Sequence, residues 1–513
     1  MRIIIFGPSG AGKSTLTKIL ARVLCHRLKV ITGDDYIRRG SENWNALHDI
    51  IVGTQHFIFD HISSPTIISH CGIVPDLAIG LTGHRIEFSS LNGANAKDDI
   101  NYSSKQVDVA RAICKHTIEV ASIQSALRHV LEFFREAGIF PERIESFVVK
   151  TASQCNLNCS YCYMYQALDD SFKSAPRGMP LNVAARLSRR LSEHFRAGGA
   201  DQISIILHGG EPLLLPTSEF RSILAALGAE LRDCNFRFSV QTNGTRLSCE
   251  YLDLLDEYGV QIGISVDGAG PIANRHREYH SKKPAYDEIV AGIDRCNSYR
   301  FTKGSFGGVL CVVDPTACGK TTYRQLRSLG VKSIDFLLRD ETYTFAPGGL
   351  TTASSAGIYL TDAFDEWLAD PEPCDVRLFT VIIALSLGAV YSTDSLGLYP
   401  YDAIGVGVAG EWELLDILRI CWPGAWKTPY TVFDTSVSDI MCSAELARLH
   451  QWQYDFSDSC LGCKHLVVCG GGYLPHRYSG ENGFRNPSTH CASLYALIEH
   501  VQDRLSQVNL ATR

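Results

Sequence analysis

Three cysteines stand close together in the stretch CNLNCSYCYMY, at Cys155, Cys159 and Cys162. Closely spaced thiolates bind metals, and the number of thiolates indicates which kind of metal site they form. A structural zinc ion is closed by four protein ligands, and no fourth cysteine or histidine stands obviously near in the sequence. An iron-sulfur cube held by three thiolates keeps one iron open for an outside ligand. The incomplete count therefore favours a [4Fe-4S] cluster with an open iron, and zinc is the alternative.

The same stretch resembles the radical S-adenosylmethionine (SAM) enzymes. It has the C-x3-C-x2-C spacing just after a strand-like run, with the aromatic Tyr161 immediately before the third cysteine. In that family the open iron binds the amino and carboxylate groups of SAM, and an electron from the cluster cleaves SAM to a 5′-deoxyadenosyl radical that abstracts hydrogen. The resemblance implies a SAM-binding [4Fe-4S] cluster, SAM itself, and a flavodoxin- or ferredoxin-type electron donor.

Three further stretches match the family in the same order along the chain. LHGGEPL resembles the segment that holds the methionine amino group, FSVQTNG the strand end that contacts the ribose, and ISVDG with a later arginine the group that grips the SAM carboxylate. Each alone is also typical of an ordinary turn. The SAM-binding residues that the resemblance implies are Gly209, Gly210, Glu211, Pro212, Ser239, Asn243 and Arg277.

A second group of cysteines lies near the end of the chain, at Cys460, Cys463, Cys469 and Cys491. Four thiolates fit either a closed zinc site or a fully ligated cube. The stretch resembles the SPASM extension of peptide-modifying radical SAM enzymes, which carries auxiliary clusters on seven cysteines. Tyr473 and the LGLYPYD stretch stand where two of those cysteines are expected. The resemblance therefore implies one auxiliary [4Fe-4S] cluster, with zinc as the alternative.

A subgroup is indicated by the stretches VVKTASQCNLNCSYCYMYQALDDSF, ILHGGEPLLL, IDFLL and WELLDIL. They resemble the cyclophane-forming radical SAM/SPASM maturases that act on FxS-type precursor peptides. The resemblance implies that a ribosomally made peptide is crosslinked between a side-chain Cβ and an aromatic ring, the auxiliary cluster accepting an electron. Asp402 is a candidate base by position, although a solvated loop carboxylate explains it equally well. A thioether-forming or formylglycine-forming maturase, and a nucleotide-gated protein with structural metal sites, stay open as alternatives.

A glycine loop opens the chain as GPSGAGKST, directly after the apolar run RIIIF. It matches G-x-x-x-x-G-K-[ST], in which backbone N–H groups surround phosphates, a lysine adds charge and a hydroxyl reaches Mg²⁺. The pattern predicts binding of ATP or GTP with magnesium. The residues concerned are Gly7, Gly10, Gly12, Lys13, Ser14 and Thr15.

Phosphoryl transfer by this region is a separate question. ITGDDY resembles the segment of nucleoside-type kinases where an aspartate contacts the acceptor hydroxyl, which indicates Asp34 or Asp35. Ser69 stands where such kinases carry an acidic residue, and after Arg85 no arginine follows until Arg111. Because phosphoryl transfer needs carboxylates for magnesium and arginines for the transferring charge, a binding domain and a working kinase are equally favoured.

Composition limits the partners. The 513 residues carry a formal charge of -7 and are 45% hydrophobic. This composition lacks the excess of basic residues that is typical of nucleic-acid-binding proteins. No apolar run is long enough to span a membrane, and no signal peptide is evident, so we expect a cytoplasmic protein. Eighteen cysteines in such a chain indicate metal ligation and buried thiols rather than disulfides.

The elements that must position these residues follow from hydrophobic periodicity. Six short apolar runs alternate with helical stretches from residue 145, which predicts repeated β-α units on a parallel sheet. The resemblance implies a partial (β/α)6 radical SAM barrel, so the fold class is α/β with a SPASM-like extension and an N-terminal P-loop domain. The boundaries we predict are 1–90 for the P-loop domain, 91–144 for a helical connector, 145–345 for the radical SAM core, 346–440 for a second connector and 441–513 for the extension.

Overall fold

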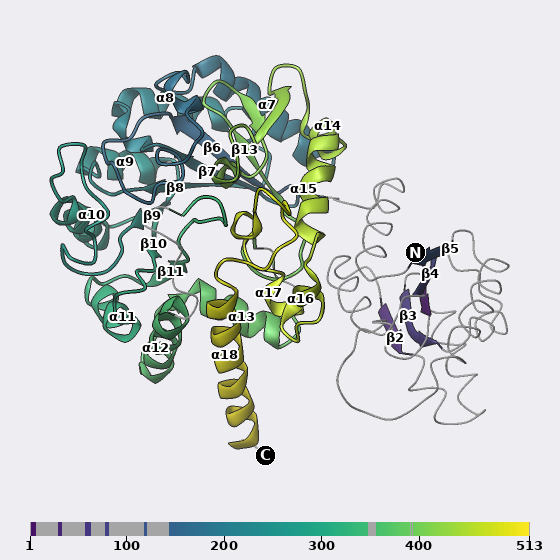
Figure 1. The fold of residues 1–513 in the computed structure, drawn as a ribbon. Helices are drawn as coiled ribbons and strands as arrows, with labels where there is room; N and C mark the ends of the chain where they lie inside the picture. Colours follow the sequence, from purple (N-terminus) through teal and green to yellow (C-terminus); the bar gives the residue numbers. More distant parts are fainter. Residues whose placement is uncertain are drawn as a thin grey trace. The chain divides into compact units, whose positions relative to one another are not determined.

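The computed structural model describes residues 143–346, 355–389, 391 and 393–511, together with five short strands nearer the start of the chain. The chain divides into two compact units (Figure 1). The first comprises Met1–Phe140 with residues 397–400 and 454–467, and the second comprises Pro141–Leu396, Tyr401–Gln453 and Val468–Arg513.

The first unit contains a five-stranded parallel sheet in the order β2-β3-β1-β4-β5. Its strands are Arg2–Phe6 (β1), Lys29–Thr32 (β2), Phe57–Ile62 (β3), Leu77–Leu81 (β4) and Thr117–Val120 (β5). With β1 in the centre, the strand order reverses beside it, and open α/β sheets bind ligands outside the carboxyl end of the strands at such a point. The predicted nucleotide loop Gly7–Thr15, Asp34 and Asp35 lie outside the described residues, so nucleotide binding stays a prediction.

One element of this sheet differs from the sequence-based expectation. Strand β5 lies inside the stretch 91–144, whose periodicity predicts a helical connector, and the first unit extends to Phe140 rather than ending at residue 90. The strand sequence TIEV is short and rich in β-branched residues, which favour strands. Periodicity alone cannot separate so short an apolar run from part of a helix.

The second unit is built on six parallel strands, β6 to β11, joined by helices. The strands are Ser146–Ala152 (β6), Ile203–Gly209 (β7), Phe236–Thr242 (β8), Gln261–Ser265 (β9), Ser305–Val312 (β10) and Ser333–Leu337 (β11). The connecting helices are Leu181–Arg196 (α7), Thr217–Gly228 (α8), Cys249–Glu257 (α9), Tyr286–Ser298 (α10) and Gly319–Ser328 (α11). Neighbouring strands pair in sequence order, which confirms the predicted β-α units and partial barrel.

Alternation along each strand separates a core face from an inner face. In β7, Ile203, Ile205 and Leu207 are fully buried, whereas His208 is only partly buried. Because side chains point to opposite faces in turn, the buried set packs beneath the helices. The other set faces the interior of the partial barrel, where polar residues collect.

Four more strands extend this sheet to ten. They are Asp375–Val376 (β12), Ala403–Val406 (β13), Glu411–Glu413 (β14) and Lys427–Thr431 (β15). Strand β13 runs parallel to β6 and adds to its open edge, with Ala403 opposite Ser146. The predicted connector 346–440 therefore contributes four strands to the sheet.

The remaining α-helices lie between β11 and the end of the chain. They are Ser355–Ala369 (α12), Arg377–Ser386 (α13), Val437–Met441 (α14), Ala444–Tyr454 (α15), Asp458–Leu461 (α16), Leu466–Cys469 (α17) and Cys491–Ala511 (α18). Gly357 brings α12 close to α18, because a Cβ there would lie 3.0 Å from the Cα of Ser493. Within the described part of the chain, no helix is both long and apolar enough to span a bilayer.

Candidate active site at the carboxyl ends of the barrel strands

The loop that carries the first three cysteines leaves the carboxyl end of β6. It turns back on itself through backbone hydrogen bonds from Cys162 N to Cys159 O (3.1 Å) and from Tyr165 N to Cys162 O (3.2 Å). Cys155, Cys159 and Cys162 are partly buried and form no disulfide. Active-site residues of barrel enzymes collect at this end of the strands, so the loop lies where chemistry is expected.

These thiols fit an iron-sulfur cluster by the chemistry of their donor set. Burial raises the pKa of the Cys162 thiol to about 12 and also raises that of Cys155, and for both the neighbouring cysteines add to the effect. A bound metal cluster reverses this preference, because its positive charge favours thiolates. Within the described residues, no three cysteine, histidine or carboxylate side chains already converge into a metal site, so the ligand set stays a prediction.

The GGEP segment lies tightly against the cysteine loop. Gly210 N donates to Ala152 O (2.9 Å) and Glu211 N donates to Gln154 O (2.8 Å). Gly209 has φ +131°, a conformation that only glycine adopts readily. A Cβ on Gly209 would collide with the carbonyl of Ala152 at the end of β6, and a Cβ on Gly210 with the carbonyl of Gln154 in the cysteine loop. The two glycines are therefore required for this close approach.

Glu211 is fully buried and joins the ends of β7 and β8. Its carboxylate accepts hydrogen bonds from Thr242 Oγ1 (2.6 Å), Asn243 N (2.7 Å) and Leu213 N (3.0 Å). Burial raises the pKa of this carboxyl, and the three donors oppose that rise. In the structure, Glu211 holds the loops in place through protein donors. Its contact with SAM stays a prediction.

Asn243 connects the end of β8 to the cysteine loop. Its Nδ2 donates to Asn156 Oδ1 (3.0 Å) and lies 3.8 Å from Cys155 Sγ, while its Oδ1 accepts from Thr245 N (3.0 Å). Ser239 lies in the middle of β8, opposite Ile206 of β7. The structure thus brings Gly209, Gly210, Glu211 and Asn243 to the cysteine loop but places Ser239 further down the strand.

Arg277 is engaged by a residue that the sequence analysis did not single out. Its Nε and Nη2 each lie 3.0 Å from an oxygen of Asp267, which also accepts from Tyr161 OH (2.5 Å) and Val312 N (3.1 Å). The guanidinium lies 5.5 Å from the centre of the Tyr161 ring. Asp267 stands in the ISVDG stretch at the end of β9, and that position was the signal available in the sequence.

A cavity of about 280 Å³ opens inside the barrel beside the cysteine loop and is termed the barrel cavity. Its polar lining includes Tyr163, His208, Asp340, Asp416 and Tyr473. Tyr163 OH donates to Asp416 Oδ2 (2.7 Å). Tyr473, which replaces an expected cysteine, forms part of the wall.

Two of the four carboxyl groups that line the barrel cavity, Asp340 and Asp416, differ in acidity. Burial raises the pKa of Asp340 to about 7, with a further contribution from the nearby Asp416 charge. Burial also acts to raise the pKa of Asp416, but Lys150, His208 and the Tyr163 hydroxyl bring it below its ordinary value. Groups with opposite shifts in one cavity are candidates for proton transfer.

Asp402 lies elsewhere. Its carbonyl oxygen accepts from Glu145 N (3.1 Å) and Ser146 N (3.2 Å), at the amino end of β6. The cysteine loop leaves the opposite end of the same strand. The structure therefore does not bring Asp402 to the candidate site, because β13 begins at Ala403 in register with the start of β6.

The four cysteines of the second group fall on both units. Cys460 lies in α16 and Cys463 follows it, in the first unit, whereas Cys469 ends α17 and Cys491 begins α18, in the second. The auxiliary cluster stays a prediction.

Residues 149–315 match the radical SAM superfamily. The chain carries a radical SAM domain. This range includes the three cysteines, the GGEP segment and Arg277.

The chain is similar to anaerobic sulfatase-maturating enzymes. A serine-type enzyme of Klebsiella aerogenes is 28% identical over 250 residues, which cover 47% of this chain and 58% of that protein. A serine-type enzyme of Bacteroides thetaiotaomicron is 26% identical over 390 residues, which cover 71% of this chain and 90% of that protein. The chain thus spans little more than half of the first relative and most of the second.

Solved structures share the fold. The anSMEcpe enzyme with bound AdoMet and Cp18Cys peptide has a TM-score of 0.60 at 20% identity, covering 72% of this chain and 99% of that one. Streptococcus suis SuiB bound to precursor peptide SuiA has a TM-score of 0.50 at 14% identity, covering 77% and 89%. At identities this low, the comparison shows a shared fold alone.

Proposed function

We propose that this chain is a radical SAM enzyme that modifies a ribosomally made peptide by closing a carbon-carbon crosslink between an aromatic ring and a side-chain Cβ. The observation that carries the proposal is the cysteine loop beside the barrel cavity, with carboxyl groups of opposite acidity in the same lining. The names of the relatives support a peptide or protein substrate, because they mature sulfatases or were crystallised with peptides.

The residues at the strand ends have separate tasks in this proposal. Cys155, Cys159 and Cys162 would hold the cluster, which on binding SAM would supply the radical that abstracts hydrogen. Glu211 fixes the ends of β7 and β8, and Asp267 fixes the Arg277 guanidinium. These buried contacts keep the loops in place before any substrate binds.

Crosslink formation removes two hydrogens from the peptide. One leaves as an atom from the Cβ, and the other leaves the ring as a proton, with one electron passing to a one-electron acceptor. The sequence predicts that acceptor as the auxiliary cluster. Asp340 is the carboxyl group placed to take the proton, since its pKa of about 7 leaves it ready to accept near neutral pH.

A second function is favoured by the comparisons. The sulfatase-maturating relatives support oxidation of a serine or cysteine to formylglycine, which leaves an aldehyde and no crosslink. A thioether-forming maturase would instead join a cysteine sulfur to carbon.

Tandem mass spectrometry of the product tests these readings. Reconstituted enzyme, SAM, dithionite and a candidate peptide should give 5′-deoxyadenosine only when the peptide is present. A crosslinked product loses two hydrogens, lacks fragment ions between the joined residues and does not react with a hydrazide probe. A product that reacts with hydrazide establishes the formylglycine reading, and absence of SAM cleavage with every peptide overturns both.

A further inference from the structure

A second cavity, of about 320 Å³ and termed the side cavity, lies between β6, the segment after the cysteine loop and the strands β13 to β15. None of the predicted SAM-binding residues lines it. Its volume is at the low end of the range for ligand sites, so it suits a short segment rather than a whole peptide. Phe172, Pro176 and Val408 give it apolar walls.

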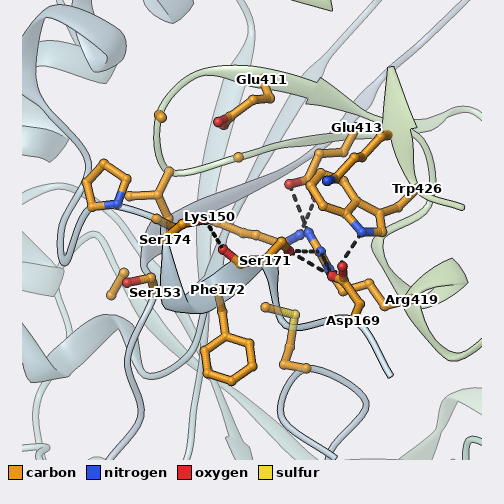
Figure 2. A pocket seen from close by; sticks show the side chains of 18 of the residues that line it. Lys150, Ser153, Asp169, Ser171, Phe172, Ser174, Glu411, Glu413, Arg419 and Trp426 are labelled. Atoms are coloured by element: carbon orange, nitrogen blue, oxygen red, sulfur yellow. Dashed lines mark hydrogen bonds and ion pairs between the residues drawn. The ribbon is translucent and has the colours of Figure 1, made fainter. Parts of the chain in front are cut away.

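Most charges in the side cavity neutralise one another. Lys150 forms an ion pair with Glu413, and Arg419 contacts Glu413 (3.0 Å), Asp169 and the face of Trp426, 3.6 Å from its centre. Figure 2 shows this network as a connected group. Such buried, mutually paired charges hold the cavity wall in place, but they leave little net charge for a ligand to bind.

Glu411 stands apart from this network (Figure 2). Among the residues that the structure describes, none forms an ion pair or hydrogen bond with the Glu411 carboxylate, and Glu411 is only partly buried. A carboxylate oxygen of Glu411 and one of Glu413 both lie within 3.0 Å of the position that a Cβ on Gly407 would occupy. Lys427 pairs in register with Glu413 rather than with Glu411. Glu411 thus lies outside the paired network, and a cation beside it gains from its charge.

The edge of the sheet offers few free donors to an added strand. Strand β15 is an edge strand, but Pro429 has no N–H, and the N–H groups of Tyr430 and Thr431 already donate to Thr428 Oγ1 (3.3 Å) and Asp434 Oδ1 (2.9 Å). An edge with its donors occupied resists pairing with another chain. We therefore expect a ligand to reach Glu411 through the cavity.

Lys150 links the linings of the side cavity and the barrel cavity. Lys150 lines the side cavity, and its Nζ lies 3.8 Å from Asp416 Oδ2, which lines the barrel cavity. A peptide whose reacting residues occupy the barrel cavity would place neighbouring residues in the side cavity.

We propose that the side cavity binds the part of the peptide that flanks the modified residues, and that Glu411 selects a lysine or arginine side chain there. This inference rests on the proposed function, because it takes the peptide from that proposal. The apolar walls contact the aliphatic stem of the basic side chain, and Glu411 accepts from its charged end.

Fluorescence anisotropy with the full-length chain tests this proposal without turnover. The probes are three dye-labelled, capped hexapeptides that are identical except for a central arginine, norleucine or glutamate. We expect the arginine probe to bind the native protein about tenfold more tightly than the norleucine probe. E411Q should reduce that ratio to about one, and E411K should favour the glutamate probe. K427Q is the matched control in the same cavity and should keep the preference for arginine.

Equal affinity of the native protein for the arginine and norleucine probes, or an unchanged preference in E411Q, overturns the inference. Peptide-dependent SAM cleavage without charge preference leaves the proposed function standing while this inference falls. Charge preference at Glu411 in a protein that never modifies a peptide leaves the side cavity as a binding site and removes the proposed function.

Discussion

Arg277 and Asp267 form a buried, two-pronged ion pair, with both nitrogen-oxygen distances at 3.0 Å. The carboxylate also holds Tyr161 and the backbone of Val312, so it links the cysteine loop to the ends of β9 and β10. This pair fixes the guanidinium that the resemblance assigns to SAM.

Asp267→Asn should lower the free energy of unfolding by about 3 kcal/mol, because it leaves the Arg277 charge buried without a partner. Urea denaturation followed by circular dichroism measures the change. Glu257→Gln breaks the exposed pair with Arg221 and should alter the curve little. Equal effects of the two substitutions would contradict the role given to the buried pair.

Gly210→Ala should prevent the GGEP segment from closing on the cysteine loop, since its Cβ would collide with the Gln154 carbonyl. We expect iron incorporation at the first cluster to fall and stability to drop by about 1–3 kcal/mol. Gly228→Ala is the control, because only a ring carbon of Phe238 lies near, at 4.0 Å. Normal iron content in the Gly210 variant would show that the segment has room to shift.

Asp340 gives the proposed reaction a pH dependence. Its pKa of about 7 means that product formation should rise with pH through this value, as the base loses its proton. Asp340→Asn should reduce product about 100-fold while 5′-deoxyadenosine still forms. Asp402→Asn, at the other end of the barrel, should keep product formation and serves as the control.

Stability changes in the opposite direction to activity at Asp340. Its pKa is raised from an unfolded value of about 3.9, so the protonated group contributes stability that is present below that value and is lost as pH rises towards 7. Asp340→Asn should therefore flatten the stability profile in this window. A profile that is unchanged in the variant would count against the raised pKa.

Removing the first three cysteines tests the metal content. Anaerobically reconstituted protein should hold about eight irons, and the triple alanine variant of Cys155, Cys159 and Cys162 about four, with SAM cleavage abolished. About four irons and one zinc in the native protein would place zinc at the second group and remove the predicted electron acceptor. Absence of iron would overturn the enzyme reading.

Lys13→Ala tests the nucleotide loop. The substitution should abolish ATP binding measured by calorimetry, because the lysine charge faces the phosphates in such loops. If nucleotide binding controls delivery of the peptide, the response of peptide turnover to ATP should disappear as well. Unchanged turnover and an unchanged ATP response would rule out that control.

The barrel could be predicted from the sequence because each strand repeats a local pattern. VVKTA, ISIILHG and FSVQT are short runs rich in apolar residues, and the cysteine spacing marks which strand end carries chemistry. Strand β13 could not be found in this way. Its pairing with β6 depends on residues far apart in sequence, and local periodicity carries no information about such contacts.

The same limit explains why the roles of the carboxyl groups could not be predicted from the sequence. Asp340 follows β11 without any motif, and only the closing of the sheet brings it near Asp416, which comes from a 3-10 turn after β14. Asp402 was plausible because of its neighbours in the sequence, yet the register of β13 sets it at the wrong end. Glu411 gave no signal, since its lack of a partner is a property of the folded cavity.

The pairing of β13 with β6 also orders events during synthesis. Ser146 cannot pair with Ala403 until the chain between them has been made. At 5–20 residues per second the ribosome needs roughly 13–50 seconds to make it. During that time one edge of the first barrel strand is exposed to other nascent chains. We therefore expect yields of soluble protein to depend on translation rate and on chaperones that shield strand edges.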